Sequence, residues 1–250
     1  MNLNSPSLSR NHLLFAGCLC LSLLALAAAA PFAASAARPA HPGRAAVNSG
    51  LSPDKGKFRI LVNGAQVGTE QFEISAGGTG WTAKGTSEIH PAQGPVQRVT
   101  ATLQLHADGT PGHYEWSSEG AKKASSAIDF SGTTATAELH LAGMRPYTQT
   151  FTFNSPLVLI LDNNLYHQYI VLARLYDWSK GGAQSFPVLV PQELTPGTVT
   201  VDSLGQQDVD GKKLDELRVK TEDNEIDLYL ENSRLVRIVA PSANAEIDRE

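Results

Sequence analysis

The chain has 250 residues, and its 20 Lys and Arg against 25 Asp and Glu give a formal net charge of −5 with neutral histidine. Basic residues form no run, so the sequence argues against binding to nucleic acid or to an anionic membrane surface. A chain of this length can bury a hydrophobic core of its own, and one folded domain is the expected count.

The first 36 residues are typical of an export signal. Arg10 gives a weakly positive start, an apolar stretch covers residues 13–30, and Ala34-Ser35-Ala36 offers a cleavage site of small residues. Cleavage near Ala30 is one alternative. Retention as an uncleaved anchor is another, because the apolar stretch is about long enough to span a bilayer. The sequence therefore predicts a bacterial exported protein, periplasmic or secreted, with no stable membrane span after signal cleavage.

The two cysteines of the chain, Cys18 and Cys20, both lie inside this predicted signal peptide. Gly17-Cys18 is similar to part of a lipoprotein acylation site, but most of the apolar stretch follows Cys18, which disfavours lipidation. The mature chain is therefore expected to contain no disulfide, although its compartment would permit one. Without Arg10 it has 19 Lys and Arg against 25 Asp and Glu, a net charge of −6.

A change of sequence pattern marks the start of the domain. Residues 37–56 are rich in Ala, Pro, Gly and Ser, which predicts a flexible linker. A single β domain is expected over residues 57–250. At its start, Phe58, Ile60 and Val62 alternate with Lys57, Arg59 and Asn63, and Asn63-Gly64 supplies a two-residue turn. This pattern predicts a strand with one buried face and a hairpin.

The same signals continue through most of the domain. Segments of period two, bounded by turn residues, predict further strands at residues 67–74, 81–90, 96–107, 113–118, 124–130, 133–141, 147–153, 157–161, 185–190, 198–204, 213–221, 225–231 and 234–240. Many short strands with regular turns predict a mainly β fold, an antiparallel sheet curved into a half-barrel or open barrel.

One segment, residues 163–180, departs from this pattern. Its apolar residues recur at steps of four, three and four, which places them on one helical face: Leu165, Tyr169, Leu172 and Tyr176. Asp162 or Asn163 can cap the start of such a helix, and Gly181-Gly182 suits its end. Because most of its surface is apolar, we expect the helix to pack on the concave face of the sheet.

The aromatic residues of the predicted helix are the candidate ligand-binding residues. His167 and Arg174 mark its narrow polar side, which leaves a wide apolar surface. As a functional hypothesis, four aromatic side chains line a cavity and hold a lipid or other apolar ligand: Tyr166, Tyr169, Tyr176 and Trp178. As a structural alternative, which apolar stripes favour more often, they simply complete the core.

No group of residues specifies a reaction. The sequence has no G-x-S-x-G motif, the mature chain has no cysteine, and the histidines lack the spacing of metal ligands. Glu225 and Asp227 share one strand face beside a turn, where a solvated surface is more typical than a pair of glycosidase carboxylates. We therefore predict no catalytic residue, no metal and no cofactor. An enzyme whose site is assembled by the fold stays open.

The order of a β-meander, one apolar helix and a closing meander resembles the curved half-barrel of the periplasmic lipoprotein-carrier-like superfamily. Two parts of the sequence are similar to the first and last hairpins of exported bacterial domains of unknown function: residues 58–64 with Val67-Gly68, and residues 217–221, 226–230 and 235–238. The resemblance implies a hollow concave face for an apolar ligand. It supplies no catalytic residue, and a likeness of fold does not determine function.

The leading hypothesis is a non-enzymatic envelope protein that binds an apolar or lipid-like ligand in the concave face of a curved sheet. One alternative is an envelope scaffold acting through protein contacts at a sheet edge, and another is a hydrolase. A deep apolar cavity would favour the binding protein. An uncovered sheet edge on a filled core would favour the scaffold, and converging polar groups with shifted pKa values would favour the hydrolase.

Overall fold

The computed structural model describes residues 50–121 and 123–250. The predicted signal peptide, residues 1–36, and the predicted linker as far as residue 49 lie outside the described residues. The first strand begins at Asp54, so it takes in the last residues of the segment expected to be a linker. No helix in the described ranges has the length and apolar character needed to cross a membrane.

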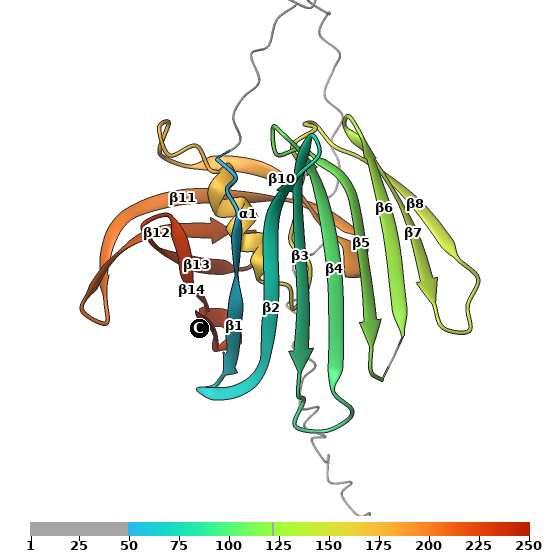
Figure 1. Cartoon of the computed structure of the whole chain (residues 1–250), viewed down its shortest axis with the longest axis horizontal. Coiled ribbons are helices and arrows are strands. Elements are labelled where there is room, and N and C mark those ends of the chain that lie inside the picture. The colour runs from blue at the N-terminus through green and yellow to red at the C-terminus, as the bar shows by residue number, and fades with distance from the viewer. Residues whose placement is uncertain (1–49, 122) are drawn as a thin grey trace, which may run out of the picture.

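The N-terminal half of the domain is a meander in which each strand pairs antiparallel with the next (Figure 1). Its strands are β1 (Asp54–Val62), β2 (Ala65–Gly77), β3 (Gly80–Ile89), β4 (Gln97–His106), β5 (Pro111–Glu119), β6 (Ala124–Ser131), β7 (Thr134–Leu141) and β8 (Tyr147–Thr152). Asn63 and Gly64, between β1 and β2, both have positive φ, as the predicted two-residue turn requires.

The C-terminal half contains the one α-helix of the described residues and a second meander. Its elements are β9 (Leu159–Ile160), α1 (His167–Leu175), β10 (Gln184–Val190), the 3₁₀ turn η1 (Pro191–Glu193), β11 (Thr195–Val209), β12 (Lys212–Lys220), β13 (Glu225–Glu231), β14 (Arg234–Ala240), the 3₁₀ turn η2 (Pro241–Ala243) and β15 (Ala245–Arg249). The short strand β9 is parallel to β10, whereas the other neighbouring strands of this half are antiparallel.

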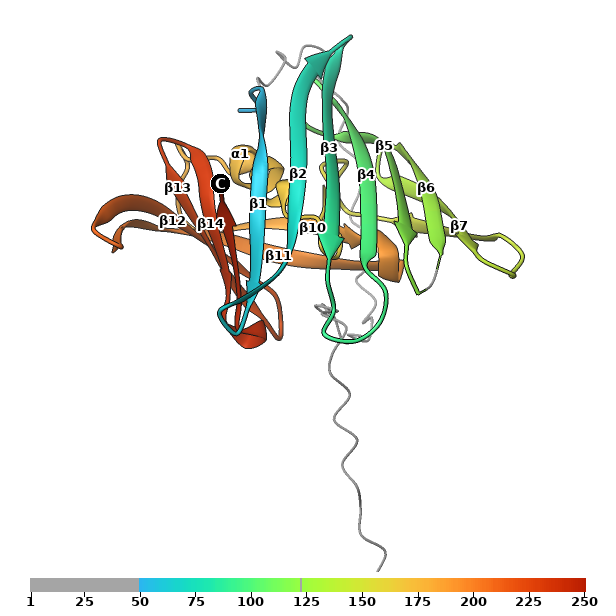
Figure 2. The same cartoon turned by 60° about the horizontal axis from the view of Figure 1, so that its bottom comes forward.

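The first and last strands join the two halves into a single sheet. Phe58 of β1 lies opposite Arg249 of β15, and Val62 lies opposite Ala245. The resulting sheet has 15 strands, with β8 at one edge and β9 at the other. In Figures 1 and 2 the two meanders diverge from this seam as two walls of a curved sheet. The prediction of a mainly β, open and curved sheet with one helix is confirmed.

The largest departures from the predicted strands are at β15 and β11. β15 has no counterpart among the predicted strands, because its buried side carries only Ala245 and Ile247 and so gives a very short alternating signal. β11 was predicted to end at residue 204 but continues to Val209, with a shift of register between Ser203 and Gly205. A bulge of this kind bends a strand without ending it.

The helix is shorter than the predicted segment, residues 163–180. Asn164 has a positive φ of 61°, so the chain is not helical there, and Tyr176 has an extended ψ of 127° that ends the helix. Tyr166 occupies the N-cap position without a side-chain cap of its own. The prediction that Asp162 or Asn163 caps the helix is therefore wrong, and the group that replaces them comes from the sheet.

Inward-facing side chains of both meanders and of the helix form one hydrophobic core. Residues 167–173 of α1 are all buried, and the helix contacts β3 of one meander and β14 of the other. The largest fully buried side chains come from all three parts: Phe58, Ile60, Ile74, Leu103, Tyr114, Ile128, Leu165, Ile170, Leu172, Leu189, Leu217 and Leu228.

Candidate functional site

A row of inward-facing residues runs across the N-terminal meander from the helix to the sheet edge. We call it the central row, and its members lie directly opposite one another on successive strands: Gly85, Ala101, Trp116, Ser126, Leu139 and Tyr147. Adjacent strands are roughly 4.8 Å apart, so one step along the row is one strand spacing. Trp116 and Ser126 are 5% and 4% exposed, whereas Tyr147 at the edge is 55% exposed. The row therefore leads from the core to solvent.

At its buried end, the row meets a hydrogen-bonded pair, Glu70 of β2 and His167 of the helix. Glu70 Oε1 lies 2.6 Å from Nδ1 of His167, and both residues are 0% exposed. Glu70 Oε2 accepts the backbone N–H groups of Tyr166 and His167, at 2.8 and 3.1 Å. Free N–H groups at a helix start favour a negative charge, so Glu70 caps α1 from the sheet. A side chain at Gly85 would collide with both partners, which explains the glycine there.

Seven buried polar side-chain atoms have no hydrogen-bond partner among the described residues: Nε of Arg59 and of Arg249, and five that lie on or near the central row. These five belong to the central row, to the row beside it and to the start of the helix: Trp116 Nε1, Ser126 Oγ, Ser87 Oγ, Tyr166 Oη and His167 Nε2. A buried polar atom without a partner costs about 1–3 kcal/mol. Because proteins satisfy nearly all such atoms, a group of them on one face is a candidate place for a polar ligand atom or for an ordered water.

The open end of the inner face is apolar. The hairpin of β7 and β8 carries three exposed large apolar residues, Leu141, Met144 and Tyr147, beside the partly buried Leu139. Leu139 and Leu141 share the inner face with Ser126, because residues two apart on a strand point the same way. An apolar group entering from this edge would thus reach the central row without crossing charged residues.

The predicted aromatic residues are not brought together as one lining. Tyr166, Tyr169 and Tyr176 are buried, whereas Trp178 is 43% exposed. Tyr176 donates its hydroxyl hydrogen to the Gly182 carbonyl at 2.7 Å, and its ring meets the Trp178 ring edge-on at 5.2 Å. Tyr166 lies at the opposite end of the helix, beside Glu70. Burial raises the pKa of the Tyr166 and Tyr169 hydroxyls well above the ordinary value.

A second buried carboxylate ties the helix to both meanders. Asp162 accepts the Tyr114 hydroxyl of β5 at 2.8 Å and the backbone N–H of Gln192 in η1 at 2.9 Å. Gln168 of α1 accepts the Asp162 N–H at 2.5 Å and donates to the Tyr114 hydroxyl at 3.1 Å. Burial raises the pKa of Asp162 to about 6, although these hydrogen bonds act in the opposite direction.

A third cluster, the clasp, joins the end of the helix to the seam between β1 and β15. Asp54 accepts hydrogen bonds from Arg249 at 2.5 Å and from Arg174 at 3.0 Å. The Arg249 guanidinium also lies 4.9 Å from the Phe72 ring centroid, a cation–π contact. The predicted polar side of the helix, His167 and Arg174, is therefore buried in ion pairs at both of its ends.

The outer face of the same meander carries a shallow groove of about 340 Å³. Seven outward-facing residues of β4, β5, β6 and β7 line it: Thr100, Thr102, Glu115, Ser117, Ser125, Ala127 and His140. Three residues of the central row, Ala101, Trp116 and Ser126, also border the groove from the same strands, although they face the core.

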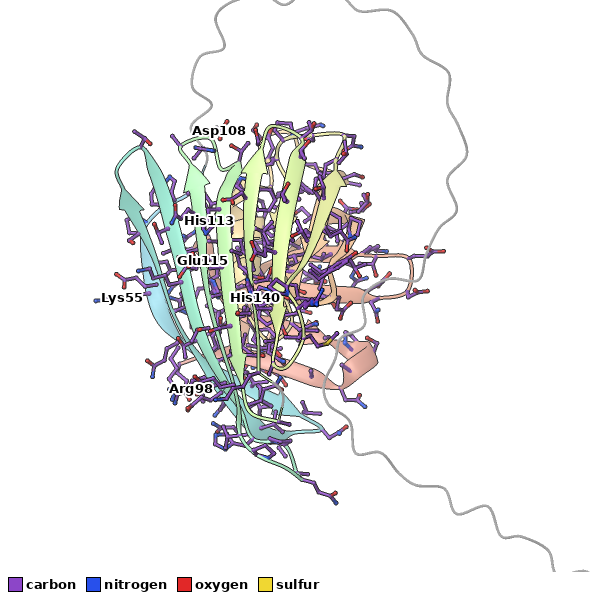
Figure 3. The ribbon with its side chains drawn as sticks, turned by 90° about the vertical axis from the view of Figure 1, so that its right-hand side faces the viewer. Lys55, Arg98, Asp108, His113, Glu115 and His140 are labelled. Carbon is purple, nitrogen blue, oxygen red and sulfur yellow. The ribbon has the colours of Figure 1, made fainter. Side chains whose placement is uncertain are left out.

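Histidines beside this groove are paired with carboxylates (Figure 3). His113 lies 2.7 Å from Asp129 and 3.0 Å from Glu115, and His140 lies 2.9 Å from Glu138. Burial lowers the pKa of His113, but the two carboxylates outweigh it and raise that pKa overall. No group of three His, Cys, Asp or Glu side chains in the described ranges could hold a metal ion.

Glu70, which organises the buried end of the site, is not among the residues predicted from the sequence. A signal was present, because Glu70 is in phase with Phe72 and Ile74 on the buried side of β2. A carboxylate on the core side of a strand indicates a buried partner. Asp227 also differs from expectation: it is 8% exposed and binds Arg218 at 2.7 Å, so it is not part of a solvated face.

No family model and no curated protein matches this chain. Among solved structures, the chain is similar to a crystal structure of a beta-barrel-like protein of the domain of unknown function DUF1849 from Brucella abortus. The TM-score is 0.53 at 11% sequence identity, and the match covers 80% of this chain and 95% of that chain. At this identity the similarity concerns the fold alone: a barrel-like arrangement also found in a bacterial domain of unknown function.

Proposed function

We propose that this chain is an exported, non-enzymatic envelope protein that binds an apolar or lipid-like ligand on the inner face of its curved sheet. One observation carries the proposal: the buried polar atoms without partners on the inner face are continuous with an exposed apolar hairpin. A ligand with one polar group and an apolar chain matches both parts of this surface. The resemblance to the lipoprotein-carrier half-barrel and the predicted export signal are consistent with it.

The proposed binding surface revises which aromatic residues contact the ligand. Tyr166 remains a candidate, because its buried hydroxyl is unpartnered beside the central row. Tyr176 and Trp178 donate hydrogen bonds at the other end of the helix, Tyr176 to the Gly182 carbonyl beyond it and Trp178 to the Ala173 carbonyl of its last turn. Their role in this proposal is to hold the helix in place. In this proposal α1 packs on the concave face and closes the inner end of the binding surface.

Native mass spectrometry of the mature protein, purified from its own envelope and then extracted with organic solvent, tests this proposal directly. We expect a bound apolar molecule at a one-to-one ratio. A bare protein mass that stays unchanged after incubation with envelope lipids would contradict the proposal and favour a scaffold that acts through the uncovered β8 edge.

A pair of variants on β7 locates the surface. Leu139→Gln places a polar group on the inner face, whereas His140→Gln alters the adjacent, outward-facing residue. With the neutral fluorescent probe N-phenyl-1-naphthylamine, we expect Leu139→Gln to weaken binding about tenfold, since it replaces apolar contact by a desolvated amide. His140→Gln should leave binding unchanged. Equal effects of the two variants would place the ligand elsewhere.

One observation favours a second function, ester hydrolysis. Ser87 lies directly opposite Glu70 on the inner face, and the Ser87 hydroxyl and His167 Nε2 are both unpartnered next to the Glu70–His167 pair. A serine, a histidine and an orienting carboxylate are the parts of a nucleophilic site. If wild type hydrolyses p-nitrophenyl butyrate, Ser87→Ala should abolish the activity and Ser118→Ala, on the same inner row, should not. No turnover by wild type would exclude this function for that ester.

A further inference from the structure

We infer that the ligand presents an uncharged carbonyl, as in an acyl ester or amide, and that Trp116 and Ser126 bind its oxygen. The inference rests on the proposed binding function and deepens it by naming the ligand class. Trp116 and Ser126 lie directly opposite each other on β5 and β6, both facing the core. Opposite side chains on one sheet face start about 4.5–5.5 Å apart, so one ligand oxygen can contact both.

The hydrogen-bonding capacity of these side chains requires an acceptor. The indole Nε1–H of Trp116 can only donate, and the Ser126 hydroxyl can donate as well. Both atoms are buried without a partner in the described chain. A ligand that offered only donors would leave the Trp116 N–H unsatisfied, at a cost of about 1–3 kcal/mol. The ligand group at this position is therefore an oxygen acceptor: a carbonyl, a carboxylate or a phosphate.

The charges around the inner face favour an uncharged carbonyl over a carboxylate or a phosphate. The two most enclosed arginine side chains that the structure describes, Arg174 and Arg249, both bind Asp54 in the clasp. On the inner face, the ionisable groups that contact the central row at Gly85 are Glu70 and His167, and the Glu70 carboxylate would repel an anion. Burying a carboxylate or phosphate without a cation is strongly unfavourable, whereas a carbonyl needs only hydrogen-bond donors.

The rest of the central row sets the direction of the acyl chain. From Ser126 the row continues through Leu139 to the exposed Tyr147, two strand spacings or roughly 10 Å away. On the opposite side, Ala101 and Gly85 are small, and His167 fills the space above Gly85. The chain therefore extends toward the β8 edge, and the carbonyl is the buried end of the ligand.

Two lipids with the same acyl chain separate the alternatives: monoolein, an uncharged ester, and oleate, a carboxylate. Each is titrated against the mature protein loaded with N-phenyl-1-naphthylamine, and displacement gives its affinity. We expect monoolein to bind at least tenfold more tightly than oleate. Trp116→Phe and Ser126→Ala should each weaken monoolein binding about fivefold to tenfold, as expected for one lost hydrogen bond.

Matched controls keep the test specific. Trp81→Phe removes an indole N–H from β3, outside the central row, and Ser125→Ala removes the neighbouring hydroxyl on the outer face of β6. Both should bind monoolein within twofold of wild type. Infrared spectra with ¹³C-labelled ester carbonyl add a direct readout: the stretch should shift to lower wavenumber on binding, and the shift should shrink in Trp116→Phe.

The possible failures are distinguishable. Oleate binding as tightly as monoolein, or unchanged monoolein affinity in Trp116→Phe and Ser126→Ala with the probe still bound, would overturn the carbonyl assignment and leave the binding function standing. Failure of wild type to bind the probe and both lipids would overturn the proposed function itself. Far-ultraviolet circular dichroism of each variant confirms that a loss of binding is not a loss of folding.

Discussion

Two regions of this molecule bury polar side chains, and they differ in how many hydrogen-bond partners those side chains have. In the clasp, Asp54 is bound by both Arg174 and Arg249, which also donate to the backbone carbonyls of Ser52 and Lys55. On the central row, Trp116 Nε1 and Ser126 Oγ are just as deeply buried but have no partner within the described chain. In the clasp one atom, Arg249 Nε, also lacks a partner in the described ranges, but the other nitrogens of that guanidinium bind Asp54 and the Lys55 carbonyl. On the central row the Trp116 indole and the Ser126 hydroxyl have no hydrogen bond at all to the described residues. Side chains held by several hydrogen bonds stabilise a fold, whereas polar side chains with none need another explanation, such as a bound partner.

The largest expected effect is on the free energy of unfolding, and it tests whether the clasp stabilises the fold. Asp54→Ala removes the shared carboxylate and leaves two enclosed guanidinium groups without a counter-charge, which should lower the free energy of unfolding by about 3–5 kcal/mol. Urea denaturation of the mature protein measures it. Lys57→Ala, which breaks an exposed pair with Glu250, is the control and should change stability by less than about 1 kcal/mol. Similar effects of the two variants would show that the clasp is not a stabilising centre.

An intermediate effect concerns the pH dependence from Asp162, a buried carboxylate that has partners but no cation. Its pKa is about 6 in the folded protein against an ordinary 3.8, so the folded state binds the proton more tightly. Its contribution to stability is therefore complete below about pH 3.8 and is lost as pH rises through about 6, a total of about 3 kcal/mol.

Comparison with Asp162→Asn isolates this contribution from those of other groups. The stability of wild type relative to the variant, from urea midpoints between pH 4 and pH 7, should fall as the pH rises. A difference that stays constant over this range would mean that Asp162 ionises normally in the folded protein.

The smallest expected effect is also on stability, and it tests whether Ser126 of the central row lacks a hydrogen-bond partner in the unliganded protein. Ser126→Ala removes a buried hydroxyl that has no partner, so the unliganded protein should keep its stability or gain up to about 1 kcal/mol. Thermal unfolding of delipidated wild type and variant checks this. A loss of more than about 1 kcal/mol would show that Ser126 makes a stabilising hydrogen bond in the unliganded protein and would weaken the contrast.

The sequence predicted the architecture well because alternation and turns are local signals. Asn63-Gly64, for example, identifies both a turn and the phase of the strands on either side. Helix length was overestimated, because the apolar period continues through residues 163–166 and 176–180 although Asn164 and Tyr176 leave helical geometry. Here the backbone follows contacts with distant residues, among them Glu70, that no local pattern contains.

The candidate site was harder to predict because it depends on register. Trp116 and Ser126 become neighbours only once the pairing of β5 with β6 is fixed, and their connection is a loop without a diagnostic turn sequence. The four aromatic residues of the predicted helix gave a stronger signal, yet three of them are buried. Tyr176 and Trp178 hold the segment at the end of the helix through hydrogen bonds to backbone carbonyls. Glu70 was the one site residue whose unusual phase could be read from its own strand.

The pairing of β1 with β15 has a consequence for how the domain forms. A chain that is made, and threaded through any channel, from its N-terminus presents β1 (Asp54–Val62) well before β15 (Ala245–Arg249). Until then β1 has only β2 as a neighbour, and its other side is an unpaired edge. Contacts between residues so distant in sequence close slowly and late. The seam can therefore close only after β15 has emerged, and until then β1 exposes a strand edge open to chaperones and to aggregation.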